Sequence, residues 1–112
     1  MELLHLHNEP FQAIKNKTKT IEMRLNDDKR RNLKEGQIIE FKNRSTNETL
    51  TAKIIKLHLF PSFTELYAAF PKEKIGYQET EKANPKDMEK YYSKEEQTKY
   101  GVVGIEFQVI NK

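Results

Sequence analysis

The chain has 112 residues, of which 36% are hydrophobic and 33% are charged, with a net charge of +3 and a mean hydropathy of −0.88. This length predicts a single domain over residues 1–112, with a small core and a heavily solvated surface. The absence of cysteine excludes disulfides and thiolate metal sites, and no apolar run reaches membrane-spanning length. The first ten residues do not have the pattern of a signal peptide, so we expect a cytoplasmic protein.

The positive charge is concentrated in one block of the sequence. Residues 15–44 hold ten lysines and arginines against five acidic residues, whereas the rest of the chain holds ten against twelve. A local basic field favours anionic partners, nucleic acid or nucleotides first. Lysine is also a common way to solvate a surface, so the charge alone leaves both interpretations open.

The first part of the chain predicts two strands around one short helix. Leu4 and Leu6 alternate with other residues, which is typical of a strand. Asn8 can cap a short helix, and Asn16 can end it in a left-handed conformation. The alternating stretch KTIEMR, residues 19–24, predicts the second strand.

Two further strands follow a polar segment. Residues 25–36 predict a loop with one helical turn, and residues 37–43 and 49–60 predict the third and fourth strands. The alternation fails at Ile54 and Ile55, which indicates a bulge or bend in the fourth strand.

The last part of the chain predicts three helices and a closing strand. Residues 62–70 have the clearest pattern, because Ser62 and Glu65 match a capping box and four apolar side chains share one face. These four are Phe63, Leu66, Tyr67 and Phe70. Residues 84–92 and 93–101 predict the other two helices, and residues 102–110 predict the strand. A second capping box, formed by Ser93 and Glu96, begins the last helix.

This order of elements predicts an α+β fold. Short strands with helices concentrated late in the chain are typical of a small mixed β-barrel of about five or six strands, with helices packed around it.

Lys19, Glu22 and Arg24 form the group most relevant to function. On a regular strand Glu22 and Arg24 share one face, with α carbons roughly 7 Å apart, and Lys19 points away unless it lies in the turn before the strand. If all three meet, the cations can bind an anion, and the carboxylate can accept hydrogen bonds from a base or sugar or move a proton. The alternative is a solvated strand whose ion pair contributes less than about 1 kcal/mol.

Several motifs, taken in order, resemble the ASCH family, the activating-signal-cointegrator homology domain, which is related to the PUA barrel of RNA-modifying proteins. KTIEMR matches the family's Lys-Thr-x-Glu-x-Arg signature. LKEGQIIEF, residues 33–41, matches a Gly-Asp-x-Ile-x-Phe-like turn into a strand, and residues 91–107 resemble the closing segment of short bacterial members. The resemblance spans nearly the whole chain and implies a PUA-like barrel.

The resemblance also implies a site and shows two departures from the family pattern. It carries the family motif onto Lys19, Thr20, Glu22 and Arg24, in a cleft beside the barrel that suits RNA or a nucleotide-like ligand. Lys17 occupies the position of a family glycine, although Asn16 could supply the turn. Gln37 replaces the usual aspartate after Gly36.

One branch of the family hydrolyses acetylcytidine with a nucleophilic threonine, and this chain has Glu22 at that position. A carboxylate cannot replace the hydroxyl, because the acyl intermediate would be an anhydride, but Glu22 could act as a base on water. Thr20 shares the predicted strand face of Glu22 and Arg24 but lies two residues too early. The resemblance therefore leaves two hypotheses: a module that binds RNA or a modified nucleoside, or a small hydrolase of such a nucleoside or of RNA with Lys19 and Glu22 as its catalytic pair.

Other residues complete the predicted site. The candidate ligand-binding residues are Thr20, Arg24, Tyr92 and Ser93, the last two because they lie at a predicted helix start. The candidate nucleic-acid contacts are the basic residues Lys17, Lys29, Arg30, Arg31 and Lys34. A third hypothesis is a protein-interaction module that uses the tyrosine-rich late helices.

No cofactor or metal is predicted. His5 and His7 could share a metal ion from one strand face, but no third ligand follows them, and polar strand positions are the simpler interpretation. The sequence has no phosphate-binding loop, no GxGxxG and no nucleophile elbow. We therefore expect RNA or a nucleoside or nucleotide as the partner, and no membrane.

Overall fold

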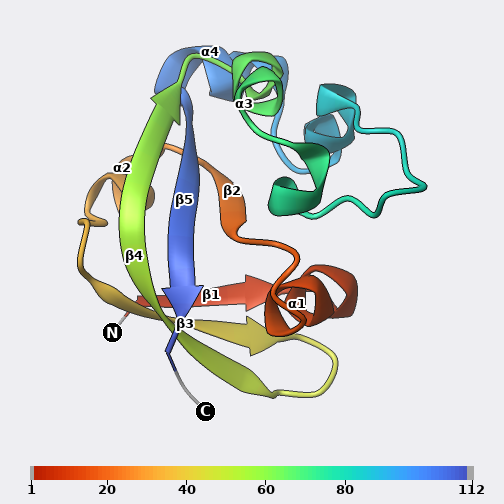
Figure 1. The fold of residues 1–112 in the computed structure, drawn as a ribbon. Helices are drawn as coiled ribbons and strands as arrows, with labels where there is room; N and C mark the ends of the chain where they lie inside the picture. The colour runs from red at the N-terminus through yellow and green to blue at the C-terminus, as the bar shows by residue number, and fades with distance from the viewer. Residues whose placement is uncertain (1, 111–112) are drawn as a thin grey trace.

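The structure, a computed structural model, describes residues 2–110. Within this range five strands form one curled sheet in the order β1-β3-β4-β5-β2 (Figure 1). The strands are β1 (Glu2–Leu6), β2 (Ile21–Leu25), β3 (Ile38–Asn43), β4 (Thr49–Phe60) and β5 (Val102–Val109). β1 pairs with β3 in parallel, and the other neighbours are antiparallel. The sheet is a half-barrel with β1 and β2 at its edges, which confirms the predicted α+β fold.

The helices pack around this sheet. They are α1 (Asn8–Lys15), α2 (Asp28–Arg31), α3 (Phe63–Ala69) and α4 (Lys94–Tyr100), with two 3₁₀ helices, η1 (Lys72–Ile75) and η2 (Pro85–Lys90). Figure 1 shows α3 and α4 together where β4 ends and β5 begins, with α1 near the opposite end of the sheet. The helix predicted over residues 84–92 is instead the shorter η2. Among the described residues, no helix is long and apolar enough to cross a membrane.

The core has two parts that cover different faces of the sheet. The first fills the half-barrel and includes Phe11, Phe41 and Phe107, with the rings of the last two 4.8 Å apart. The second lies between β2 and the later helices, and it includes Ile21 and Leu66. Both parts consist of fully or nearly fully buried side chains, so β2 is fixed in place by the elements packed on it.

The turn from α1 to β2 differs from the prediction. Asn16 has a right-handed conformation with a φ of −80°, and Lys17 is the left-handed residue, with a φ of 68°. The left-handed conformation costs a residue with a Cβ about 1–2 kcal/mol. The residue that replaces the family's glycine therefore adopts the conformation that favours glycine, and Asn16 does not supply the turn.

Three other local predictions have different outcomes. The register of β4 against β5 shifts between Ile54 and Lys56, which confirms the bulge. Ser93 and Glu96 form the predicted capping box at the start of α4. The box at α3 is wrong, because the Ser62 hydroxyl donates to the Glu65 carboxylate and does not cap the backbone.

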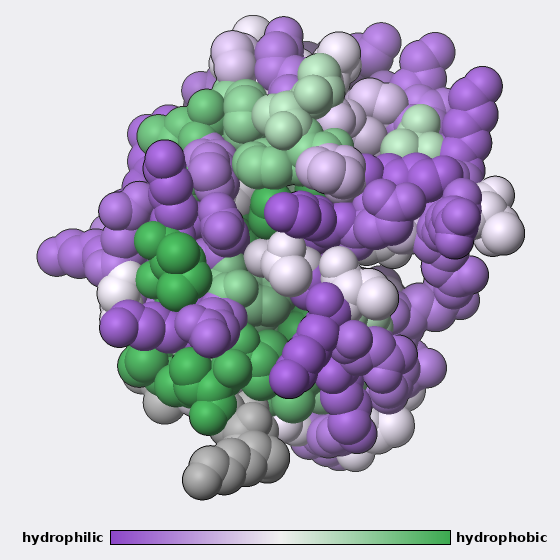
Figure 2. All heavy atoms as spheres, in the orientation of Figure 1, coloured by the Kyte–Doolittle hydropathy of each residue, from purple (hydrophilic) through white to green (hydrophobic). Residues whose placement is uncertain are grey.

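Polar and apolar surface gather on different parts of the molecule. Figure 2 shows hydrophilic surface over most of the side that carries α1, η1 and η2. Hydrophobic surface lies mainly over the lower part of the sheet in the same view. The exposed large hydrophobic residues include Ile55, Leu59 and Ile110, which come from β4 and from the residue after β5.

Candidate functional site

The side chain of Arg24 joins the two edge strands of the half-barrel at one point, the seam. Arg24, in β2, donates a hydrogen bond of 2.9 Å from Nη2 to the backbone carbonyl oxygen of His5, in β1. The alternation of β2 explains this orientation, because Ile21, Met23 and Leu25 pack into the second core cluster. The side chains of alternate residues therefore turn toward the seam.

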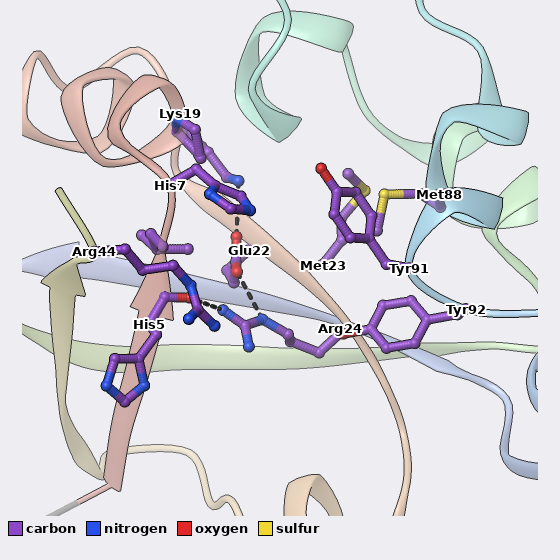
Figure 3. A pocket seen from close by; sticks show the side chains of 12 residues that line it. His5, His7, Lys19, Glu22, Met23, Arg24, Arg44, Met88, Tyr91 and Tyr92 are labelled. Atoms are coloured by element: carbon purple, nitrogen blue, oxygen red, sulfur yellow. Dashed lines mark hydrogen bonds and ion pairs between the residues drawn. The ribbon is translucent and has the colours of Figure 1, made fainter.

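A pocket of about 210 Å³ opens beside this seam (Figure 3). One side comes from the end of β1, the first turn of α1 and Arg44, which follows β3. The other side comes from η2 and the tyrosines that follow it, Tyr91 and Tyr92. Lys19, Glu22 and Arg24 lie between the two sides.

Glu22 is buried between two cations. Its Oε1 lies 2.7 Å from Lys19 Nζ, and its Oε2 lies 2.7 Å from Arg24 Nε. Only 4% of Glu22 and 6% of Lys19 is exposed. Burial by itself would raise the pKa of Glu22, but the charges of Lys19 and Arg24 and their hydrogen bonds lower it to about 2. Burial by itself would lower the pKa of Arg24, but the charge of Glu22 and its hydrogen bond raise that pKa.

The start of β2 explains how Lys19 reaches Glu22. The strand begins at Ile21, so Lys19 lies in the turn before it, where strand alternation does not set the side-chain direction. Its backbone amide donates to Ala13 in α1, at 3.1 Å. The side chain runs against Gly76, where a Cβ would lie 3.2 Å from Lys19 Cδ. The space that Gly76 leaves is therefore part of the site, and Gly76 was not among the residues predicted for it.

The structure does not bring Thr20 into this pocket. Thr20 also precedes the strand, and it lines a separate hollow together with Lys17. Its backbone is held on both sides, because its amide donates to Lys74 and its carbonyl accepts from Phe107. The shared face predicted for Thr20 and Glu22 is therefore wrong: the regular alternation begins only at Ile21.

Of the two residues predicted at the start of the last helix, only one lines the pocket. Tyr92 is half-buried, stacks on Phe63 with ring centroids 5.8 Å apart, and lines the pocket. Burial raises the pKa of its hydroxyl. Ser93 is not among the lining residues, and its side chain accepts from the amide of Glu96 as a helix cap.

The basic residues of α2 and its surroundings lie outside the pocket. Lys29 forms a long, exposed ion pair of 3.8 Å with Glu2. Arg31 donates to the carbonyl oxygen of Asn26 at 2.9 Å, and Lys34 is exposed. The charge of Arg30 acts on the Tyr92 hydroxyl and lowers its pKa, against the larger effect of burial. Lys29, Arg30, Arg31 and Lys34 together form the α2 basic group.

Arg44, His5 and His7 also line the pocket, although none of them was predicted as a site residue. Arg44 lies in a turn after β3, and its amide donates to the carbonyl oxygen of Leu6 at 2.8 Å. The parallel pairing of β1 with β3 is what places Arg44 beside the histidines. No local pattern predicts that pairing, so the sequence held no signal for Arg44. Within residues 2–110 no group of three side chains is placed to hold a metal ion.

The fold and the site define a small α+β half-barrel domain with a charged pocket at its seam. Residues 4–111 match the ASCH domain family, so the chain belongs to this family. The chain is also similar to two solved structures over nearly its whole length. The crystal structure of the hypothetical protein PH0355 is 32% identical with a TM-score of 0.84, and the match covers 98% of this chain and 100% of that one. The solution structure of protein PF0455 from Pyrococcus furiosus is 27% identical with a TM-score of 0.76, covering 99% and 98%. None of the curated proteins is significantly similar to the chain.

Proposed function

We propose that this chain binds RNA and holds one nucleotide or modified nucleoside in the pocket beside the seam. The observation that carries the proposal is the buried group of Lys19, Glu22 and Arg24, in which Glu22 forms an ion pair with each of the two cations. Each carboxylate oxygen of Glu22 keeps a lone pair for a base amino group or a sugar hydroxyl. Lys19 and Arg24 keep donors for a carbonyl or an anion. Such a rigid set of donors and acceptors suits recognition of a base edge, because little ordering is needed on binding.

The size of the pocket indicates that it holds only one nucleotide of a larger ligand. Its volume of about 210 Å³ is below the about 300–1,000 Å³ typical of pockets that enclose a whole drug-sized ligand. One nucleotide of an RNA chain would therefore lie in the pocket, and the rest of the chain would lie outside. Tyr91, 59% exposed at the rim, offers a ring on which a base can stack. The α2 basic group would then supply salt-sensitive contacts to phosphates outside the pocket.

The state of Glu22 favours binding over hydrolysis. With a pKa of about 2, its carboxylate is a weak base at neutral pH. Both of its oxygens already accept a hydrogen bond from a cation. Thr20, a hydroxyl close in sequence, lines a different hollow. We therefore propose recognition, without turnover, as the function of this site.

The test compares Glu22→Gln with a matched control. Glu22→Gln keeps the shape of the side chain and removes its charge, whereas Glu95→Gln makes the same change on an exposed residue of α4. We expect wild type and Glu95→Gln to bind short single-stranded RNA, and Glu22→Gln to bind at least about tenfold more weakly. Circular dichroism checks that the variants are folded.

Three outcomes would contradict this proposal. If wild type binds neither RNA nor nucleosides, or if Glu22→Gln binds as well as wild type, the pocket is not the RNA site. If wild type converts acetylcytidine or cleaves RNA, and Glu22→Gln does not, the site is hydrolytic and the carboxylate acts as its base.

A further inference from the structure

One side of the pocket carries cationic or donor side chains that have no partner within residues 2–110. His5, His7 and Arg44 are exposed, and all three line the pocket. None of these three side chains makes a hydrogen bond or an ion pair with another residue of the described range. Figure 3 shows the Arg44 side chain extending toward the Arg24 guanidinium, with the two imidazoles on the same side of Glu22 as Arg44.

The charges on this side do not balance. Lys19, Arg24 and Arg44 carry three positive charges against the single negative charge of Glu22, which leaves +2 before either histidine is protonated. The first turn of α1 also lines the pocket, through Pro10, and a helix presents the positive end of its dipole there. An anion with several oxygens would satisfy these donors and reduce the repulsion between the guanidinium groups.

The opposite side of the pocket is apolar and aromatic. Met23, Met88 and Tyr91 lie there, across Glu22 from Arg44 in Figure 3. Tyr91 packs against Tyr92 with ring centroids 6.5 Å apart and leaves 59% of its surface exposed. A flat, uncharged ring system fits this side, because aromatic and thioether groups offer stacking and dispersion contacts. A ligand that fills both sides therefore has an aromatic end and an anionic end.

We infer that the side of the pocket formed by Arg44, His5 and His7 binds the phosphate of a nucleotide whose base lies against Tyr91. This inference rests on the proposed function and narrows its ligand to phosphorylated nucleotides. The planar guanidinium of Arg44 donates two parallel hydrogen bonds to phosphate oxygens, and an imidazole N–H from either histidine adds a third. Glu22, between the two sides, faces the base edge or the sugar and repels a misplaced phosphate.

The phosphate can belong to a free mononucleotide or to one unit of an RNA chain. In both ligands a base is linked through a sugar to a phosphate. Separate titrations of the protein with mononucleotides and with RNA show which of the two ligands it prefers. The probes are the four common nucleosides and acetylcytidine, the corresponding monophosphates, and a short single-stranded RNA of mixed sequence. Calorimetry measures the affinity. Changes in the NMR chemical shifts of backbone amides in β1, β2 and η2 show that binding occurs at the pocket.

The variant that tests the inference is Arg44→Gln, with Lys53→Gln as its control. Arg44 is exposed with no side-chain partner in the described range, so its replacement leaves the fold intact. Lys53 is an exposed residue of β4 that lines none of the hollows described above, and the change in charge is the same. In wild type and the control we expect each monophosphate to bind at least about tenfold more tightly than its nucleoside. Arg44→Gln should remove that difference and leave nucleoside affinity unchanged.

The salt dependence gives a second readout for the same variant. For RNA, we expect Arg44→Gln to make the plot of log binding constant against log salt concentration less steep. The slope should change by about 1, the amount for one lost phosphate contact. A mononucleotide that binds as tightly as RNA identifies the free nucleotide as the ligand, whereas tighter RNA binding identifies the polymer.

The possible failures are distinct from one another. If nucleosides and monophosphates bind equally and Arg44→Gln changes neither, the phosphate inference is wrong and the proposed function stands. If no nucleoside, nucleotide or RNA shifts the pocket amides of wild type, both proposals are wrong.

Discussion

Arg24 links the two edge strands of the half-barrel by donating to Glu22 within β2 and to the backbone carbonyl oxygen of His5 in β1. The two hydrogen bonds are 2.7 Å and 2.9 Å long. They come from different nitrogens of one planar group, so the position of the guanidinium is set by both strands at once. The pocket therefore depends on the same side chain that holds the open edges of the sheet together.

We predict that Arg24→Lys separates these two roles. An ammonium can neutralise Glu22, but it cannot also keep the forked geometry that reaches His5. The expected loss of unfolding free energy is about 1–3 kcal/mol, because a hydrogen bond from a charged donor to the strand edge is removed. Urea unfolding measures this loss. Arg31→Lys is the control, since Arg31 also donates to a backbone carbonyl but is exposed. Equal effects of the two variants would contradict the seam role of Arg24.

The low pKa of Glu22 predicts how stability depends on pH. Its ordinary pKa is 4.5 and the charges of Lys19 and Arg24, acting against burial, lower it to about 2 in the folded chain. Because the folded pKa is below the unfolded one, the ionised carboxylate stabilises the fold above pH 4.5, and this contribution is lost as the pH falls toward 2. The difference corresponds to about 3 kcal/mol of unfolding free energy.

Urea unfolding between pH 2 and pH 7 tests this prediction in wild type and Glu22→Gln. Other carboxylates titrate in both proteins, so the informative quantity is the difference between the two pH profiles. Wild type should lose about 3 kcal/mol more than the variant over the acidic range. Parallel profiles would show that Glu22 is not held ionised by its neighbours.

The sequence predicted the residues at the centre of the site because their signal is local. Alternation in β2 put Glu22 and Arg24 on one face, and the ASCH signature pointed to the same stretch. The meeting with Lys19 depended on where the strand begins, and alternation alone does not fix a strand boundary. The same uncertainty produced the error for Thr20, which the pattern placed on the face of Glu22.

The rest of the pocket depends on contacts between distant segments. Arg44 reaches the seam through the parallel pairing of β1 with β3. Tyr91 follows η2, whose Met88 belongs to the same core cluster as Met23 of β2. No local sequence pattern predicts either of these contacts. Even local patterns were not sufficient everywhere: Ser62 and Ser93 have the same spacing to a glutamate, but only Ser93 forms the capping box.

We predict that Lys17→Gly stabilises the fold. Lys17 has a φ of 68°, and its amide donates to Ile14 at 3.0 Å, so the turn after α1 requires this conformation. Glycine adopts it without the penalty of a Cβ, although the unfolded chain gains entropy, and the expected net gain is about 0.5–1 kcal/mol. Lys17→Ala is the control, because it removes the charge and keeps the Cβ. The Tm of thermal unfolding should rise for Lys17→Gly only. If it rises for both variants, the loss of the lysine charge is the cause.

The close approach of Gly76 to Lys19 gives a prediction that separates backbone strain from the shape of the site. Gly76 has a φ of 113°, and a Cβ there would lie 3.2 Å from the Lys19 side chain. Gly36 has a φ of 88° and nothing within 4 Å of its Cβ position. Alanine at either position should lower the unfolding free energy by about 1 kcal/mol through strain. Only Gly76→Ala should also push Lys19 from Glu22 and weaken RNA binding, by about tenfold if the contact is lost. If Gly36→Ala weakens binding as much, the loss comes from general destabilisation, and Gly76 has no part in shaping the pocket.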